Sequence, residues 1–245
     1  MKKVSIIIPC YNAEKYIKES ILSALQQTYE NKEVIFVDNE SKDNSLNIAK
    51  AIKKEHPELI IETAKNIYPY SWQEPVEKAL EIFTGDYFTI LGADDIIEKE
   101  YISNNMIIFD KAPEKILCLQ SPIMGFVGDD INQKRGIVSH KYKSLKDMKE
   151  QLFKKCPVNT PTVFYSKKLQ ERGLIRWESE KYLGAVDYNL YFILADDDVF
   201  IYPVPKWLGY NYRWHDKQAT WGMHKEKTDY AKNIRDYWRE KWKQK

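Results

Sequence analysis

The sequence has 245 residues, of which 43% are hydrophobic and 30% are charged, and its formal net charge at pH 7 is +2. A chain of this length and composition can bury a substantial core, which excludes a largely disordered protein. Residues 225–245 contain eight Lys or Arg residues and four Asp or Glu residues, so the positive charge is concentrated in this tail. Nucleic-acid binders more often carry basic residues throughout the fold, and the sequence has no zinc-finger, helix-turn-helix or RNA-binding signature. We therefore expect no nucleic-acid partner.

The apolar runs and the cysteines indicate the compartment. The longest apolar runs, such as Val4 to Cys10 and Val34 to Val37, are far shorter than the roughly 20 residues that a membrane span needs. The N-terminus reaches Pro9 too early for a secretory signal. Three widely spaced cysteines without metal-ligand spacing are typical of free thiols in a reducing compartment. We expect no transmembrane helix and a cytoplasmic location.

The first half of the chain alternates short β-branched segments with helical patterns, which predicts an α/β fold with a mainly parallel sheet. Apolar residues recur at helical spacing from Ile17 to Leu25 and again from Val76 to Phe83, so each segment can pack one face on the sheet. The predicted strands are Val4 to Pro9, Glu33 to Asp38, Leu59 to Thr63 and Tyr87 to Leu91.

The second half is less regular. We predict helices at Glu98 to Lys111 and from about Ala185 to Leu194, and strands near Leu117 to Phe126 and Thr162 to Tyr165. The chain contains no Gly/Ser linker, low-complexity segment or internal repeat. A single domain over residues 1–224 is therefore predicted, followed by a helical tail over residues 225–245.

Polar pairs follow three of the predicted strands, at Tyr11-Asn12, Asp38-Asn39 and Asp94-Asp95. Ligands of open α/β sheets bind outside the carboxyl ends of the strands, so we expect these pairs to line one crevice. A nicotinamide-dependent oxidoreductase is disfavoured, because PCYNAEKY stands where a GxGxxG segment would join the first strand to the first helix.

Several segments, in the same order, resemble family 2 glycosyltransferases of the GT-A fold. Residues 4–45 resemble the family's opening strand-helix-strand unit, and residues 85–97, GDYFTILGADDII, resemble its metal-binding DxD segment. Residues 156–174 resemble the acceptor-side loop, while residues 183–194 and 210–220 resemble the regions of the catalytic base and the donor diphosphate. The resemblance implies a Rossmann-like GT-A sheet flanked by helices, with the nucleotide sugar bound by residues 1–97 and the acceptor by residues 98–224.

The implied reaction is inverting transfer of a sugar from a nucleotide-diphosphate donor to a hydroxyl acceptor, in the synthesis of a polysaccharide, a lipid-linked oligosaccharide or a glycan. The alternative is a non-catalytic sugar-nucleotide-binding or scaffold protein that keeps the fold. That alternative predicts donor binding without transfer or hydrolysis.

Asp38 and Tyr11 are the predicted readers of the donor base. A carboxylate at the end of a buried strand can accept a hydrogen bond from the imide N–H of uracil, and a tyrosine ring can stack on the base. Uridine is the expected base, although thymine presents the same edge. The alternative is that Asp38 caps the following helix and that Tyr11 packs at the sheet edge. The predicted donor site also includes Pro9, Glu14, Asn39 and Ala93, of which Glu14 and Asn39 could equally be solvated loop residues.

Asp94 and Asp95 are the predicted metal ligands. Adjacent carboxylates after an apolar strand are costly unless a cation compensates them, and Mn²⁺ or Mg²⁺ at a phosphate site is the usual arrangement. The alternative is a cap on the helix that begins near Glu98. Gly92 stands where the first aspartate of DxD usually stands, so Asp94 carries most of the expected metal binding.

The stretch YRWHDKQ resembles the segment that covers the donor diphosphate. Arg213 can bridge phosphate oxygens, and a neutral imidazole at His215 can complete a metal shell. A structural histidine is the alternative for His215. The resemblance also places Asp187 at the position of the general base, which removes the proton of the acceptor hydroxyl. Without the resemblance, an aspartate near a helix start is usually structural.

Three further features lie outside these motifs. After the third predicted strand, AKNIYPYSWQEPVEKAL replaces the segment usual in the family, and Tyr68, Tyr70 and Trp72 predict a wider aromatic surface beside the donor site. Residues 196–198 are three aspartates, which we interpret as a solvated turn. The tail is a basic amphipathic helix that either packs on the domain or makes a peripheral contact with an anionic membrane at the inner face.

Overall fold

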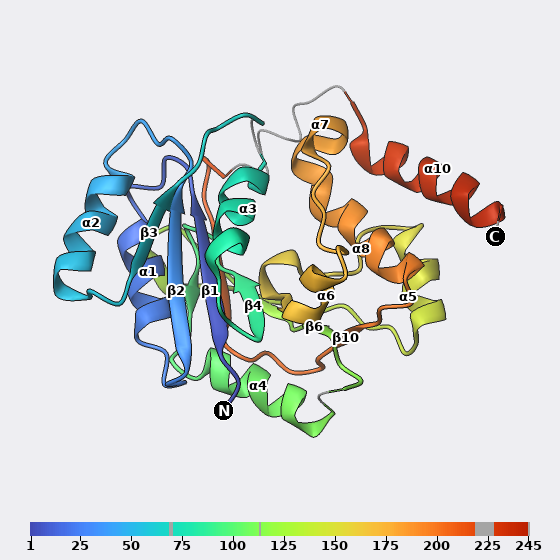
Figure 1. The fold of residues 1–245 in the computed structure, drawn as a ribbon, viewed down its shortest axis with the longest axis horizontal. Coiled ribbons are helices and arrows are strands. Elements are labelled where there is room, and N and C mark those ends of the chain that lie inside the picture. The colour runs from blue at the N-terminus through green and yellow to red at the C-terminus, as the bar shows by residue number, and fades with distance from the viewer. Residues whose placement is uncertain (69–70, 113, 219–227, 245) are drawn as a thin grey trace.

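The central element of the computed structural model is a sheet of seven strands in the described residues, which are 1–68, 71–112, 114–218 and 228–244 (Figure 1). These strands are β1 (Val4–Cys10), β2 (Lys32–Asp38), β3 (Ile60–Thr63), β4 (Tyr87–Ile90), β6 (Cys118–Gln120), β9 (Phe164–Ser166) and β10 (Ile201–Pro203). Their order is β10-β6-β9-β4-β1-β2-β3. β1 pairs in parallel with β2 and β4, β2 pairs in parallel with β3, and β9 is antiparallel to β4 and β6. The predicted mainly parallel sheet is confirmed.

The sheet separates two hydrophobic clusters, and β1 contributes to both. Ile7 packs in one cluster, whereas Ile6 and Ile8 pack in the other, because successive side chains of a strand point to opposite faces. All three are fully buried. A strand covered on both faces reads as a continuous apolar run, which explains the sequence of Val4 to Ile8.

Helices cover both faces of the sheet, as Figure 1 shows. α1 (Ile17–Leu25), α2 (Ser45–Glu55) and α4 (Tyr101–Lys111) contribute to the cluster of Ile6 and Ile8. α3 (Gln73–Ile82), α5 (Leu145–Leu152), α6 (Lys167–Glu171), α8 (Val186–Asp196) and α10 (Tyr230–Lys243) contribute to the cluster of Ile7. The shorter helices are α7 (Ser179–Tyr182) and the 3₁₀ turns η1 (Thr160–Thr162) and η2 (Leu183–Ala185).

A second sheet of four strands lies in the described part of the chain, in the order β5-β11-β7-β8. Its strands are β5 (Ile96–Ile97), β11 (Tyr210–Trp214), β7 (Ile123–Val127) and β8 (Asp130–Val138). The sequence predicted one strand-like stretch near Leu117 to Phe126, but the structure divides it between the two sheets. Pro122 lies at the break, where its missing N–H cannot continue a ladder.

The C-terminal helix packs on the domain through its apolar face. In α10, Ile234 is 0% exposed and Trp238 is 3% exposed. The Trp238 ring stacks on Phe192 of α8 at a centroid distance of 5.7 Å, and its Nε1 donates to Asn189 Oδ1 at 2.9 Å. The packing alternative for the tail is thus confirmed for residues 230–243; residues 225–227 and 245 lie outside the described residues.

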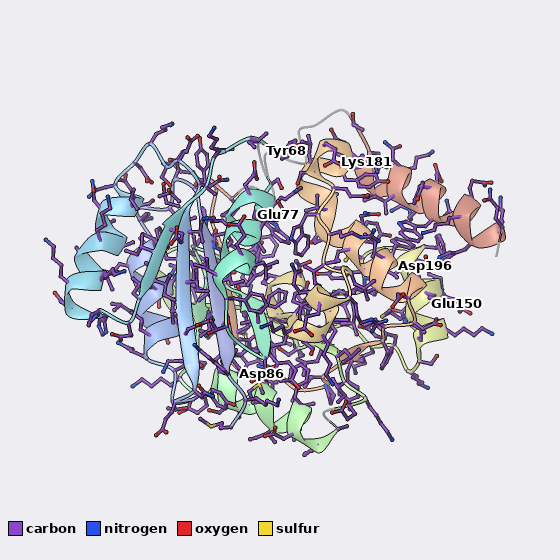
Figure 2. The ribbon with its side chains drawn as sticks, viewed as in Figure 1. Tyr68, Glu77, Asp86, Glu150, Lys181 and Asp196 are labelled. Atoms are coloured by element: carbon purple, nitrogen blue, oxygen red, sulfur yellow. The ribbon has the colours of Figure 1, made fainter. Side chains whose placement is uncertain are left out.

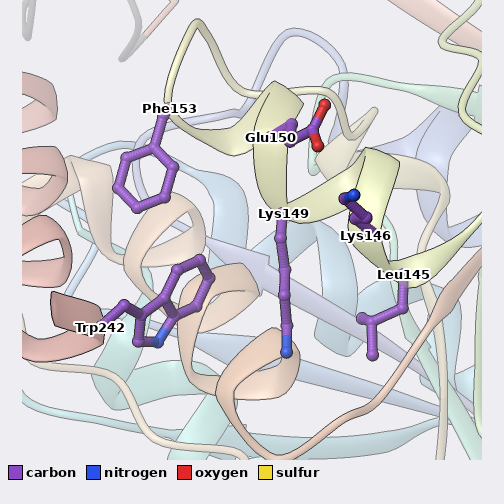
Figure 3. Close-up of a pocket in the computed structure, with 6 residues that line it drawn as sticks. All are labelled: Leu145, Lys146, Lys149, Glu150, Phe153 and Trp242. Atoms are coloured by element: carbon purple, nitrogen blue, oxygen red, sulfur yellow. The ribbon is translucent and has the colours of Figure 1, made fainter. Parts of the chain in front are cut away.

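A small cavity of about 360 Å³ remains between α5 and α10. Figure 3 shows Lys149 extending beside the Trp242 ring, with Phe153 on the other side of that ring. The Lys149 ammonium lies 5.5 Å from the Trp242 ring centroid and pairs with Asp198 at 2.9 Å.

Asp196 ends α8, while residues 197 and 198 form the turn that was predicted for the acidic triplet. Among the described residues, no helix is long and apolar enough to span a bilayer.

Candidate active site

The chain order of the parallel strands fixes where a ligand can bind. After β1 the chain adds β2 and then β3 on one side, and it returns to the other side of β1 with β4. The crevice at the carboxyl ends of β1 and β4 is therefore a topological switch point, the usual ligand site of open α/β sheets. A cleft of about 1310 Å³ opens there. We call it the central cleft.

Loops from several strands line the central cleft, and each of the three predicted polar pairs contributes at least one residue to it. Of the predicted site residues, the lining contains Pro9, Tyr11, Glu14, Asn39, Ala93, Asp94, Asp95 and His215. Three predicted residues do not belong to the lining: Asp38, Asp187 and Arg213. Tyr70, from the predicted aromatic surface, lies outside the described residues.

Near the ends of β1 and β2 the lining of the central cleft contains Tyr11 and Asn39, and Asp38 is the adjacent residue just outside that lining. Tyr11 is 50% exposed, whereas Asp38 and Asn39 are each 2% exposed. Asp38 Oδ2 accepts from the Ser41 backbone N–H at 3.1 Å, but Asp38 Oδ1 and Asn39 Oδ1 have no hydrogen-bond partner among the described residues. A buried acceptor without a donor costs free energy, so a ligand N–H that reached these oxygens would be stabilised.

Glu14 has a structural contact in addition to its place in the cleft lining. Its Oε2 accepts from the backbone N–H of Asn44, the residue before α2, at 3.0 Å. The carboxylate therefore satisfies one of the orphan donors at the start of that helix.

Asp94 and His215 approach each other across the cleft wall. Asp94 Oδ2 lies 2.8 Å from His215 Nε2, and the two side chains are 27% and 10% exposed. The Tyr16 ring packs against the imidazole at a centroid distance of 4.8 Å. In an octahedral shell with bonds of about 2.1 Å, neighbouring ligand atoms lie about 3 Å apart, so these two atoms fit adjacent positions around one divalent cation.

The protein supplies few metal ligands. Among the described residues, no group of three or more His, Cys, Asp or Glu side chains is arranged to hold a metal ion. Asp94 and His215 can together provide two ligands. The donor set fits a cation that takes its other ligands from substrate phosphate oxygens and water, which is how Mg²⁺ is usually bound at phosphate sites.

Asp95 is engaged by the protein itself. It is 2% exposed, and its two oxygens accept hydrogen bonds from the Arg213 backbone N–H at 2.8 Å and from the Tyr210 hydroxyl at 2.7 Å. Burial, together with the neighbouring Asp94 carboxylate, raises the pKa of Asp95 well above its usual range. Asp95 thus fastens the loop after β4 to β11.

The absence of a side chain at Gly92 leaves room for the carboxylates of Asp94 and Asp95. A Cβ at position 92 would lie 2.7 Å from Asp95 Oδ2 and 3.0 Å from Asp94 Oδ1. The usual first aspartate of DxD therefore does not fit this arrangement unless the loop shifts.

Arg213 supports the loop after β4, which carries Asp94 and Asp95. It is 1% exposed, with Nε donating to the Asp94 carbonyl at 2.6 Å, Nη1 to the Gly128 carbonyl at 2.6 Å and Nη2 to Glu19 Oε2 at 2.5 Å. Its guanidinium carbon lies 4.4 Å from the centroid of the Tyr16 ring. All of its nitrogens therefore bind protein groups, and none is directed by these contacts to a diphosphate.

Asp187 stands at the second residue of α8, one hydrogen bond from the cleft. Its Oδ2 accepts from Thr160 Oγ1 at 2.5 Å, and Oδ1 accepts from the Tyr188 backbone N–H at 2.7 Å. Thr160 lines the central cleft. Burial raises the pKa of Asp187 above its ordinary value, which makes the carboxylate a stronger base than a solvated aspartate.

The structure adds two cleft residues that the sequence analysis missed. Thr160 carried no local signal, because its importance depends on α8 folding back beside η1. Lys217 is exposed and lines the cleft two residues after His215. Its place in the YRWHDKQ stretch was a usable signal, since a cation in that segment can meet a phosphate.

Comparisons with known proteins identify the family and the fold. Residues 5–174 match the family described as Glycosyl transferase family 2. A glycosyltransferase of Haemophilus influenzae, itself uncharacterized, is 32% identical over 141 residues, which are 58% of this chain and 42% of that protein. The chain thus spans less than half of that relative.

Two solved structures share the fold. S. aureus TarS 1-349 in complex with UDP-GlcNAc has a TM-score of 0.72 and 21% identity, covering 92% of this chain and 62% of that chain. The mannosyltransferase PcManGT from Pyrobaculum calidifontis, in complex with GDP-Man and Mn²⁺, has a TM-score of 0.63 and 17% identity, covering 90% of this chain and 59% of that chain. The predicted GT-A fold is confirmed, and, because the family match covers more than half of the sequence, the protein belongs to glycosyl transferase family 2.

Proposed function

We propose that the protein transfers a sugar from a nucleotide-diphosphate donor, a UDP-sugar, to a hydroxyl acceptor with inversion at the anomeric carbon. The observation that carries the proposal is the content of the central cleft. One cavity at the switch point contains the half-exposed ring of Tyr11, the Asp94–His215 pair and the Thr160 hydroxyl that leads to Asp187. The Tyr11 ring suits the nucleobase of the donor, the Asp94–His215 pair suits its diphosphate, and Thr160 with Asp187 suits the acceptor hydroxyl. One structural neighbour is in complex with UDP-GlcNAc and another with GDP-Man and Mn²⁺, which supports a nucleotide-sugar donor and a metal.

The donor nucleotide is assigned to the β1–β2 end of the cleft. Tyr11 stacks on the base, and the unsatisfied Asp38 Oδ1 accepts its imide N–H. Pro9 and Ala93 line the same cavity as backbone walls. The imide edge of uracil supplies such a donor, so uridine is preferred over cytidine.

The diphosphate is assigned to the wall that Asp94, His215 and Lys217 form. Asp94 and His215 would hold a divalent ion there, which supplies positive charge to neutralise the departing diphosphate. Lys217 adds a mobile cation on the same side. We assign Asp95 and Arg213 to supporting this wall, because their polar atoms already bind β11 and the loop after β4.

Asp187 is assigned as the general base. The acceptor O–H proton moves to the Asp187 carboxylate as the acceptor oxygen bonds to the anomeric carbon. The bond from that carbon to the β-phosphate oxygen breaks, and its electron pair leaves with UDP. Thr160 lies between the cleft and the carboxylate, so the proton reaches Asp187 by way of the Thr160 hydroxyl. A single displacement of this kind inverts the configuration.

Nucleotide-dependent thermal stabilisation tests the donor site. UDP, dTDP, GDP and CMP are compared with and without Mn²⁺ on the wild type, on Asp94→Asn and on the matched control Asp236→Asn, which changes an exposed carboxylate of α10. UDP with Mn²⁺ should stabilise the wild type and the control but not Asp94→Asn. Absence of stabilisation by every nucleotide contradicts the proposal.

A product assay separates catalysis from mere binding. UDP release from UDP-sugar, with and without acceptor glycosides, is measured on the wild type and on Asp187→Asn. UDP release by the wild type that Asp187→Asn abolishes supports transfer. Donor binding without release by the wild type favours the non-catalytic alternative.

We also propose a cytoplasmic location with a peripheral contact to an anionic membrane. Because the apolar face of α10 is buried, this contact would use exposed cations of α5 and α10, such as Lys146, Lys232 and Arg239. Sedimentation with phosphatidylglycerol vesicles, at low and high salt, tests it. Binding that salt removes is expected, whereas equal binding to phosphatidylcholine would contradict an electrostatic contact.

A further inference from the structure

The wall of the central cleft contains an aromatic ring that the donor site leaves unused. Trp72 lines the cleft just before α3 and is half-buried. Its ring meets Trp177 edge to face at a centroid distance of 4.5 Å, and Trp177 is 4% exposed. The second indole therefore backs the first and restricts its orientation.

Polar contacts fix the backbone on both sides of this pair. Ser71 Oγ lies 2.6 Å from Ser179 Oγ, and Gln73 Oε1 accepts from the Ser179 backbone N–H at 2.9 Å. In Figure 2, Tyr68 and Lys181 mark the two segments that this contact joins, the loop before α3 and α7. The residues on either side of Trp72 are thus both hydrogen-bonded to Ser179, so the Trp72 ring is a preorganised surface.

The same segment is tied to the helix that carries Asp187. Glu178 Oε2 accepts from Asn189 Nδ2 of α8 at 2.8 Å. Asn189 also accepts from Trp238, so α10 braces this contact from behind. The Trp72 wall and the proposed base therefore belong to one connected set of elements.

The chemistry of this part of the cleft fits a sugar ring. Pro75, Ile90 and Pro161 add apolar lining, while the Thr160 hydroxyl supplies a polar contact that continues to the Asp187 carboxylate. A pyranose presents an apolar C–H face and a polar hydroxyl edge. An indole and a hydroxyl that line the same cleft, with a carboxylate hydrogen-bonded to that hydroxyl, can complement both.

We propose that Trp72 forms an acceptor subsite for a pyranose ring, so that the acceptor is a glycoside rather than an open-chain polyol. The inference rests on the proposed function, because it takes Asp187 as the base that the acceptor must reach. The base and diphosphate of the donor are assigned to Tyr11 and to Asp94, which leaves the Trp72 and Thr160 walls for the acceptor.

Saturation-transfer NMR on the UDP- and Mn²⁺-loaded protein tests the subsite. The probes are methyl β-D-glucopyranoside and its N-acetylglucosamine analogue, with ribitol as the acyclic control. The wild type should transfer saturation to the ring protons of at least one glycoside and not to ribitol. Trp72→Leu should weaken that binding about tenfold, and Trp72→Phe should keep most of it. The matched control Tyr237→Leu, at an exposed position of α10, should bind like the wild type.

UDP binding, measured separately by thermal stabilisation, shows whether each variant is folded and whether the donor site exists. UDP binding without any glycoside signal, or an equal glycoside signal in Trp72→Leu, overturns the subsite and leaves the proposed function standing. Trp72→Leu that weakens UDP-sugar binding but not UDP binding also overturns it, because the ring would then contact the donor sugar. Failure of UDP to bind to the wild type refutes the proposed function itself.

Discussion

Replacement of Arg213 by methionine should destabilise the protein strongly while acting on the donor site only indirectly. The substitution keeps an unbranched side chain of similar length and removes every N–H donor. The backbone carbonyls of Asp94 and Gly128, whose hydrogen bonds are partly buried, then lose their partners. Each unsatisfied acceptor costs about 1–3 kcal/mol.

The other losses are smaller. Glu19, the ion-pair partner, is 53% exposed and can return to water, so its share is about 0–1 kcal/mol. The lost contact of the guanidinium with the Tyr16 ring adds about 0.5–2 kcal/mol. With the two carbonyls at about 4 kcal/mol together, the central total is about 6 kcal/mol, which lowers the melting temperature of a chain of this size by about 12–24 °C.

Urea unfolding of the nucleotide-free protein measures this cost, and UDP titration with Mn²⁺ measures the donor site. The matched control is Lys217→Met, at an exposed cleft position, which should unfold like the wild type but bind UDP more weakly. Arg213→Met should do the reverse, with a large loss of stability and a smaller loss of affinity in the fraction that stays folded. If Arg213→Met unfolds like the wild type and loses UDP binding, Arg213 contacts the diphosphate directly, and the supporting role is refuted.

Three further substitutions follow from the same contacts. Asp187→Asn should abolish transfer while leaving the melting temperature equal or higher, because burial raises the pKa of Asp187 and the ionised carboxylate opposes folding. The stability of the wild type relative to this variant should be highest below the unfolded pKa of aspartate, about 3.9. It should fall as pH rises through the folded pKa of Asp187. If the wild type instead becomes more stable than the variant as pH rises, the expected pH dependence is wrong. The rate of transfer by the wild type should rise with pH over the same window, measured as kcat/KM. His215→Gln should weaken Mn²⁺-dependent UDP binding less than Asp94→Asn does, since it removes a neutral ligand, and calorimetric titration of both variants checks the order. Gly92→Asp should lower the melting temperature without increasing Mn²⁺ affinity, because its Cβ meets Asp95 Oδ2; a gain in Mn²⁺ affinity would show that the loop adapts.

The four parallel strands and the helices α1 and α3 of the first half were predictable because each has an apolar pattern of its own, whereas α2 (Ser45–Glu55) was not predicted. Val4 to Cys10 is buried on both faces, and Ile17 to Leu25 is buried on one, so local sequence reports their surroundings. β8 and β11 were not predicted. β8 is almost wholly exposed over Asp130–Val138, and an exposed edge strand has no apolar periodicity to detect.

The candidate site likewise contains residues that the sequence could identify and contacts that it could not. Residues that directly follow strands, such as Tyr11 and Asp94, were found because strand ends are visible in the sequence and converge by topology. The partners of Asp94 and Asp187 were beyond local reasoning. Arg213 follows Asp94 by 119 residues, and Thr160 precedes Asp187 by 27 residues, so these contacts depend on tertiary structure alone.

The limited donor set of the proposed metal site would make cation and nucleotide binding interdependent. Asp94 and His215 would supply two ligands, and the rest of the shell would come from water or from the diphosphate. UDP bound without the cation would place two negative phosphates beside Asp94, which disfavours it. Thermodynamic linkage requires that the factor by which Mn²⁺ increases UDP affinity equals the factor by which UDP increases Mn²⁺ affinity. A chain with a complete three-ligand site would bind Mn²⁺ tightly alone and show little coupling. The glycine at position 92 should therefore make the metal respond to the nucleotide, so that the diphosphate site is complete only when a donor is present.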